Sequence, residues 1–170
     1  GLVADGRTVY FNAGTSIAGG LTGPGGSLNA IDLDTGKVHT VADGLAFPNG
    51  LAQLSDGSFV ATRDIGDGPM IRISPDGKTR AFAPSVASSN GIAYDAQRRE
   101  VVVSTTFAPT TEIVVISEAG KVRKRHVIPG FGPLNSADDL TLGADGDVYV
   151  TLNVAGKVVR VDRETGDLCT

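Results

Sequence analysis

Three short segments each place an oxygen-bearing side chain at the start of an apolar run. They are Pro48-Asn49-Gly50, Ser89-Asn90-Gly91 and Ala137-Asp138-Asp139. Two amide carbonyl groups and a carboxylate are hard oxygen ligands, which suit calcium, magnesium or manganese and do not suit a metal that seeks thiolates. The same segments also have a purely local explanation, because Asn-Gly is a common turn and Asn or Asp at a strand entrance bonds to nearby backbone. Which explanation holds depends on whether the fold brings the three side chains together.

The elements around these segments repeat along the whole chain. Short runs rich in β-branched residues are typical of strands, and they occur at Thr8–Phe11, Ser58–Thr62, Val101–Thr105 and Asp147–Thr151. A second set of strands ends in turns that close, at intervals of 41, 43 and 46 residues, on Gly36, Gly77, Gly120 and Gly166. A period in the low forties with several strands per period is typical of a β-propeller blade rather than of a helical repeat.

We therefore predict an all-β propeller in one domain. The chain divides into units of about 1–45, 46–86, 87–134 and 135–170, each with four strands. In a propeller the inner strands line a central channel, and their first residues ring one mouth of that channel. Asn49, Asn90 and Asp138 open the inner strands of the second, third and fourth units, so they are predicted to lie at one level of this mouth.

The composition supports a globular domain and excludes other classes of protein. Of 170 residues, 41% are hydrophobic and 20% charged, and no apolar run approaches the roughly 18 residues that a spanning helix needs, so no membrane is expected as a partner. The net charge of −4 lacks the basic footprint of a phosphate-backbone binder, which argues against nucleic acid as a partner. The lone Cys169 can form no intrachain disulfide, and Gly1–Asp5 lacks the pattern of a signal peptide. Because a cleaved leader leaves no trace, the compartment stays open.

Other residues that could do chemistry have simpler explanations. The glycines from Gly19 to Gly26 lack the Lys-Ser/Thr of a phosphate-binding loop, so we expect a long solvated loop within Thr15–Ser27. His39 and His126 lie in predicted outer strands beside charged or hydroxyl residues, which favours exposed positions. The chain contains no Gly-x-Ser-x-Gly elbow, which argues against a serine hydrolase of that type.

Several of these segments together carry a family resemblance. The strand openings at Asn49, Asn90 and Asp138, followed by Gly143–Val150 and Asn153–Asp162, resemble the family of gluconolactonase, regucalcin (senescence marker protein) and luciferin-regenerating enzyme. The resemblance spans nearly all of the chain and is strongest in the third and fourth units. It implies a six-bladed propeller that holds one divalent cation over its channel, with hydrolysis of a sugar-type lactone or a related ester as the usual activity.

By motif, the resemblance assigns Asn90 and Asp138 as metal ligands and Asn49 as a substrate contact. It implies calcium as the expected cation, with zinc, magnesium or manganese as the other choices. Asp138 is also the expected catalytic base for the attacking water, and Asp139 is expected to bind substrate or to serve as the reserve base. The family's acidic ligand from its first blade and its substrate-binding arginine have no counterpart here. Asp138-Asp139 also stands where the family usually has Asp-Gly.

Two other functions stay open. A non-catalytic propeller could bind a small ligand or a protein through the channel mouth or the Thr15–Ser27 loop, and a strictosidine synthase-like propeller would act without a metal.

At about 40 to 50 residues per blade, the 170 residues form four of the six expected blades. We therefore expect a partial propeller, completed by another chain or by a further segment, that acts on a small-molecule lactone or ester.

Overall fold

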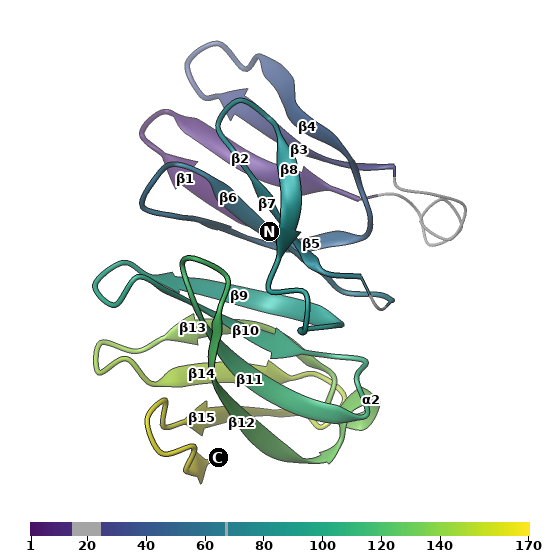
Figure 1. The fold of residues 1–170 in the computed structure, drawn as a ribbon, viewed down its shortest axis with the longest axis vertical. Coiled ribbons are helices and arrows are strands. Elements are labelled where there is room, and N and C mark those ends of the chain that lie inside the picture. The colour runs from purple at the N-terminus through teal and green to yellow at the C-terminus, as the bar shows by residue number, and fades with distance from the viewer. Residues whose placement is uncertain (15–24, 67) are drawn as a thin grey trace.

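The structure is a computed structural model that describes residues 1–14, 25–66 and 68–170. It contains four antiparallel sheets of four strands each, which are the blades of a β-propeller (Figure 1). The prediction of an all-β propeller with four blades is therefore confirmed. Within each blade the strands lie side by side in chain order, and each strand is antiparallel to the next.

The strands have the following bounds. The first blade contains β1 (Leu2–Asp5), β2 (Thr8–Ala13), β3 (Gly26–Asp32) and β4 (Val38–Leu45). The second contains β5 (Pro48–Gln53), β6 (Phe59–Arg63), β7 (Met70–Ile73) and β8 (Thr79–Phe82). The third contains β9 (Ser89–Asp95), β10 (Glu100–Thr105), β11 (Thr110–Ser117) and β12 (Val122–Phe131). A short helix α2 (Gly132–Asn135) leads into the fourth, with β13 (Ala137–Leu142), β14 (Val148–Leu152), β15 (Lys157–Val161) and β16 (Leu168–Cys169).

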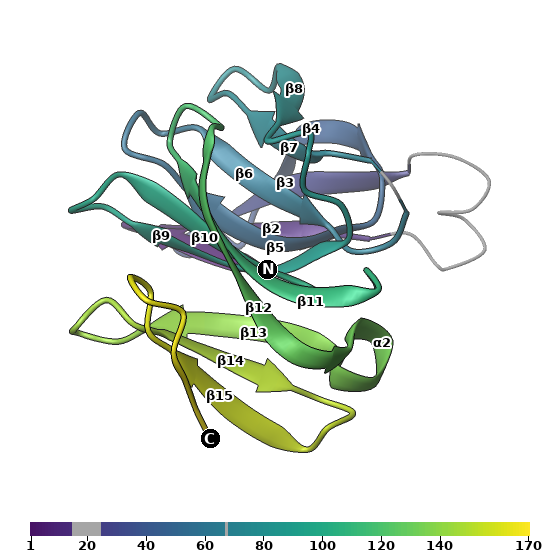
Figure 2. The same cartoon turned by 60° about the horizontal axis from the view of Figure 1, so that its bottom comes forward.

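Neighbouring blades pack face to face, and their inner strands β1, β5, β9 and β13 contact one another in that order. Figures 1 and 2 show the blades following one another, from the purple first blade to the yellow end of the fourth. All hairpins between the first and second strands of the blades lie on the left in Figure 1, so the opposite ends of these strands face right. Every blade therefore contributes equivalent residues to each end of the inner channel.

The core consists of apolar layers between the blades. Val101 and Val103 on β10 belong to the cluster between the second and third blades, whereas Val102 belongs to the cluster between the third and fourth. All three side chains are fully buried. Successive residues of a strand point to opposite faces, so a sheet covered on both faces needs an unbroken apolar run such as this one.

Two expectations from the sequence need correction. Gly26 and Ser27 belong to β3 rather than to the predicted long loop, and residues 15–24 of that loop lie outside the described residues. His39 is exposed on β4 as predicted, but His126 on β12 is half-buried, because its Nε2 atom lies 2.8 Å from the carbonyl oxygen of Arg163 in the next blade.

Within the described ranges, no helix has both the length and the apolar character needed to cross a membrane.

A buried carboxylate joins the second and third blades at the hairpin ends of their strands. Glu118, after β11, accepts hydrogen bonds from the backbone N–H of Ser55 (2.9 Å), the hydroxyl of Tyr94 (3.1 Å) and Nε of Arg99 (2.6 Å). Burial by itself raises the pKa of Glu118, but the hydrogen bonds from Ser55 and Arg99 outweigh it and lower the pKa to about 2. Glu118 therefore stays ionised and holds the two blades together at neutral pH.

An equivalent contact joins the third and fourth blades. Arg163, only 3% exposed, lies with Nη1 2.6 Å from Oδ2 of Asp95, and its Nη2 pairs with Glu100. Burial opposes ionisation of Asp95, but the backbone N–H of Arg98 and the Arg163 guanidinium lower its pKa to about 2. The contacts between the blades are thus ionic at this end and apolar in the interior.

We expect the fold to lose stability steeply in acid. Glu118 and Asp95 have lower pKa values in the folded state than in the unfolded chain, so their contribution is complete above about pH 4.5 and is lost as the pH falls towards 2. The urea midpoint measured across this range should fall, and it should fall less in Glu118→Gln than in the wild type. A midpoint that stays constant down to about pH 2.5 would contradict this prediction.

Candidate functional site

The three predicted residues occupy equivalent places at one end of the channel. Asn49, Asn90 and Asp138 are the second residues of β5, β9 and β13, as the sequence predicts. We call this end the channel mouth. Asn90 is buried, Asn49 and Asp138 are half-buried, and the neighbouring Asp139 is exposed.

Each strand entrance at the channel mouth has the same unusual backbone. The residue two positions before each predicted site residue has a positive φ of 44°, 52° or 48°, at Phe47, Ser88 and Ser136 respectively. Residues other than glycine rarely adopt this conformation, which costs roughly 1 kcal/mol. The carbonyl group of each accepts a hydrogen bond from the first residue after the second strand of its blade, namely Asp64, Thr106 and Asn153. The ends of the second strands therefore also contribute side chains to the mouth.

The glycines after the two asparagines are required by close packing of the inner strands. A Cβ on Gly50 would lie 2.5 Å from the carbonyl oxygen of Asn90, and a Cβ on Gly91 would clash in the same way with the carbonyl oxygen of Asp138. Each Asn-Gly pair is thus explained by the approach of the next blade, in addition to any turn preference. This approach fixes the spacing between Asn90 and Asp138.

Hydroxyl groups on the second strands hold the backbone of the site residues. Oγ1 of Thr62 donates to the carbonyl oxygen of Asn90 (2.7 Å), and Oγ of Ser104 donates to that of Asp138 (2.9 Å). Each bond runs from one blade to the inner strand of the next. The positions of Asn90 and Asp138 are therefore set by hydrogen bonds as well as by apolar packing.

We expect Gly91→Ala to disturb both stability and the channel mouth. The new methyl group would meet a backbone carbonyl, which cannot rotate away, so the inner strands of the third and fourth blades must separate. Overpacking of this kind costs about 1 to 3 kcal/mol, to be measured by urea unfolding. Gly14→Ala is the matched control, because a Cβ there meets no atom of a described residue within 4 Å. Equal effects of the two substitutions would contradict the close approach.

Asp64 joins the two asparagines and was missed by the sequence analysis. Its carboxylate accepts hydrogen bonds from Nδ2 of Asn49 (3.4 Å) and from Nδ2 of Asn90 (3.3 Å). Because the amide nitrogens face Asp64, the two amide oxygens are free to bind something else, and they accept no hydrogen bond from any described residue. The pKa of Asp64 is raised, mainly because its carboxyl group is buried, and the negative charge of Asp138 adds to this effect. The hydrogen bonds from Asn49 and Asn90 act in the opposite direction but do not outweigh burial.

The signal that could have revealed Asp64 is the pairing of the first two strands. Pro48 pairs with Arg63 in an antiparallel register, so the residue after Arg63 lies opposite Phe47, at the same end of the sheet as Asn49. The same logic identifies Asn153 in the fourth blade, whose Nδ2 donates to Oδ2 of Asp138 at 2.6 Å. One carboxylate oxygen of Asp138 is thus held, while the other stays available.

The donors at the channel mouth fit a hard divalent cation. They are the amide oxygens of Asn49 and Asn90 and the carboxylates of Asp64 and Asp138, all of them oxygen atoms. Within the described part of the chain, no three or more His, Cys, Asp or Glu side chains gather into a metal-binding group. A cation here would therefore depend on the amide oxygens. The exposed Asp139 lies beside this group, and its Oδ1 accepts a hydrogen bond from the N–H of Leu140 at 2.9 Å.

The sequence matches one protein family over most of its length. Residues 60–170 match the family described as the SMP-30/Gluconolactonase/LRE-like region. The predicted family resemblance is thus confirmed. A search among curated proteins found no match.

Solved structures with a similar fold span about twice the length of this chain. Virginiamycin B lyase from Staphylococcus aureus is 20% identical with a TM-score of 0.68, over 99% of this chain and 53% of the lyase. Regucalcin from Agrobacterium tumefaciens, described as a calcium-binding protein, is 17% identical with a TM-score of 0.65, over 95% of this chain and 52% of regucalcin. A luciferin-regenerating enzyme is 18% identical with a TM-score of 0.70, over 98% of this chain and 56% of that enzyme. At such low sequence identity, these comparisons show only that the folds are similar.

Proposed function

The chain belongs to the SMP-30/gluconolactonase/LRE-like family, and on this premise we propose that its channel mouth hydrolyses a sugar-type lactone or a related ester with one bound divalent cation, calcium in particular. The observation that carries the proposal is the arrangement around Asp64, which turns the amide oxygens of Asn49 and Asn90 away from itself and leaves them without a partner among the described residues. Regucalcin, a member of the same group by fold, is described as a calcium-binding protein, which supports the choice of cation.

In this proposal Asn90 and Asp138 hold the cation, and Asn49 and Asp139 contact the substrate. The cation would act as a Lewis acid that polarises the lactone carbonyl. Asp64 keeps the amide of Asn90 in the orientation that exposes its oxygen, as partners of metal ligands commonly do. No described thiolate lies near, so the donors favour calcium, magnesium or manganese over a thiolate-bound metal.

Asp138 would also take the proton of the attacking water. Its Oδ2 is fixed by Asn153, so the proton would pass to Oδ1, the oxygen that has no described donor. A base held on one side in this way can approach the water in a single orientation, which favours proton transfer. Asn49 would orient the oxygens of the substrate through its free amide oxygen.

Metal and lactone measurements on the intact protein test this proposal. We expect calcium binding in calorimetry, with zinc, magnesium and manganese titrated in parallel, and hydrolysis of sugar-type lactones that stops with chelator and returns with calcium. Absence of binding by all four metals would reject the site. Metal binding without turnover of any lactone or ester would instead favour a non-catalytic ligand-binding propeller. Turnover that chelator leaves unchanged would favour a metal-independent propeller of the strictosidine synthase type.

A further inference from the structure

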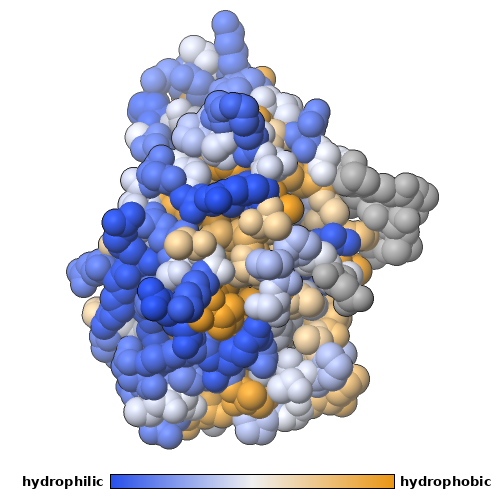
Figure 3. Space-filling model, in the orientation of Figure 1, coloured by the Kyte–Doolittle hydropathy of each residue, from blue (hydrophilic) through white to orange (hydrophobic). Residues whose placement is uncertain are grey.

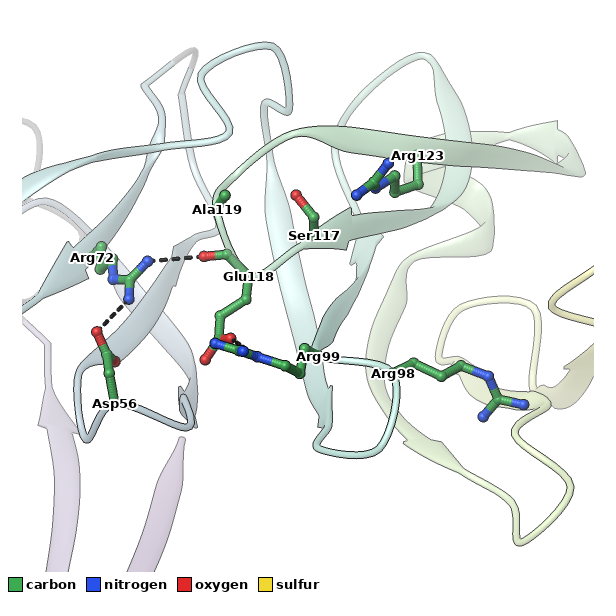
Figure 4. A pocket seen from close by; sticks show the side chains of 8 residues that line it. All are labelled: Asp56, Arg72, Arg98, Arg99, Ser117, Glu118, Ala119 and Arg123. Atoms are coloured by element: carbon green, nitrogen blue, oxygen red, sulfur yellow. Dashed lines mark hydrogen bonds and ion pairs between the residues drawn. The ribbon is translucent and has the colours of Figure 1, made fainter.

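The hairpin ends of the second and third blades enclose a cleft of about 430 Å³ on the side of the propeller away from the channel mouth. Figure 3 shows blue hydrophilic residues gathered on this left side of the molecule. The residues that line the cleft are shown in Figure 4: Asp56, Arg72, Arg98, Arg99, Ser117, Glu118, Ala119 and Arg123. We call it the arginine cleft. It lies between two blades whose strands are all described, so its walls are complete in this structure.

Arg72 forms a rigid wall of the arginine cleft. Its Nε donates to Oγ of Ser58 (2.9 Å), its Nη1 to the carbonyl oxygen of Glu118 (2.8 Å), and its Nη2 to Asp56 (2.6 Å). The side chain is only 11% exposed. Three of the five N–H groups of the guanidinium are thus engaged. Arg72 therefore provides a fixed positive charge that cannot swing away from the cleft.

Arg99 is placed in the cleft at a conformational cost. The equivalent turns of the other blades carry a glycine with positive φ, at Gly6, Gly57 and Gly146, whereas the third blade carries Arg99 with a φ of 53°. A non-glycine residue in this region is strained, and such residues are often found at functional positions. Nε of Arg99 donates to Glu118, but its two Nη groups donate to no described residue, and its side chain is 68% exposed. Both terminal nitrogens are therefore available to a ligand.

Two further groups add donors that are not used within the described fold. Arg123 on β12 makes no hydrogen bond or ion pair with any described residue, and Figure 4 shows its guanidinium near Ser117. The Oγ of Ser117 accepts from the N–H of Lys121 (3.1 Å), so its own O–H can donate to a ligand. Arg98 contributes less, because its Nη1 pairs with Asp95 and Figure 4 shows it pointing away from Arg99.

The charges of the arginine cleft are unbalanced. Arg72 pairs with Asp56, Arg99 with Glu118 and Arg98 with Asp95, which leaves the positive charge of Arg123 without a described partner in a protein whose net charge is −4. The contacts between the two blades run from Ser55 and Arg72 to Glu118, and Arg123 takes no part in them. The excess charge and the free donors therefore call for an anion.

We propose that the arginine cleft binds a phosphate group, either as free phosphate or as part of a small phosphorylated molecule. A tetrahedral dianion offers several acceptor oxygens in different directions, which matches donors that come from Arg99, Ser117 and Arg123 on separate segments. The volume suits a small metabolite. This site is distinct from the channel mouth and does not depend on the lactonase proposal.

Calorimetry and thermal unfolding at constant ionic strength test this site. Inorganic phosphate, glucose 6-phosphate and glucose are titrated separately into the intact protein. Saturable binding of a phosphate compound, with a melting temperature that rises with its concentration, is expected, while glucose has no effect. Tighter binding of glucose 6-phosphate than of phosphate would assign the site to a phosphorylated metabolite, and equal binding would assign it to the free ion.

Substitutions locate the binding. Arg123→Gln and Arg99→Gln should each weaken phosphate affinity roughly tenfold, because each removes a charge-assisted pair of donors. Arg123→Gln breaks no described contact, so it keeps the fold intact even if Arg99→Gln does not. Lys157→Gln removes the same charge from the exposed face of β15 and is the control. Absence of saturable binding, or an equal loss in Lys157→Gln and Arg123→Gln, would overturn the proposal.

Discussion

Asp138→Asn is expected to abolish calcium binding and to reduce lactone hydrolysis by at least about 100-fold. The substitution keeps the size of the side chain and its contact with Asn153. It removes the negative charge that would hold the cation and the basic oxygen that would accept the proton of water. Calorimetry with calcium and the initial rate of lactone hydrolysis measure the two losses separately.

The neighbouring carboxylate provides the matched control for this experiment. Asp139→Asn removes the same charge one residue away, from an exposed side chain whose Oδ1 is bonded to the N–H of Leu140. We expect Asp139→Asn to keep calcium affinity and to raise KM only, because Asp139 is assigned to the substrate. Equal effects of the two substitutions on calcium affinity would show that general charge, rather than the position of Asp138, controls binding.

The blades could be predicted from the sequence because each repeats the same local signals. Gly36, Gly77, Gly120 and Gly166 close turns at intervals in the low forties, and all four have positive φ in the structure. Glycine adopts this conformation without strain, so the residue type and the turn are directly linked. The six-bladed closure and the partial nature of the domain stay predictions.

The channel mouth was only partly predictable. Asn49, Asn90 and Asp138 begin strands, so the repeat alone predicts that they lie at one level. Asp64 and Asn153 follow the second strands, and locating them requires the pairing register of each hairpin. That register includes irregularities between Pro48 and Leu51 and between Ala137 and Leu140, which counting residues does not reveal.

The arginine cleft was not predictable for a different reason. Arg99 and Glu118 lie opposite each other within the third blade, next to the paired residues Glu100 and Ser117, so their contact follows from the strand register. The contacts that close the cleft instead run from Ser55 and Arg72 in the second blade to Glu118 in the third. Contacts of this kind depend on how the sheets pack, which the spacing of residues within one sheet does not determine.

Arg163→Met is expected to destabilise the protein by about 3 to 5 kcal/mol, to be measured by urea unfolding at neutral pH. Arg163 is 3% exposed and neutralises both Asp95 and Glu100, so its loss leaves two carboxylates of the third blade with one exposed partner, Arg98. Arg160→Met is the control, because Arg160 pairs with Asp147 from a side chain that is 47% exposed, and such pairs contribute no more than about 1 kcal/mol.

A second substitution separates lost charge balance from lost packing. If uncompensated charge causes the damage, adding Asp95→Asn to Arg163→Met should restore part of the stability, whereas Asp95→Asn alone should reduce it. Because Asp95 ends β9 and Asn90 lies near its start, this contact also fixes the inner strand that carries Asn90. Calcium affinity should therefore fall in Arg163→Met and recover with stability in the double variant. Recovery of stability without recovery of affinity would show that the two ends of the inner strand are independent.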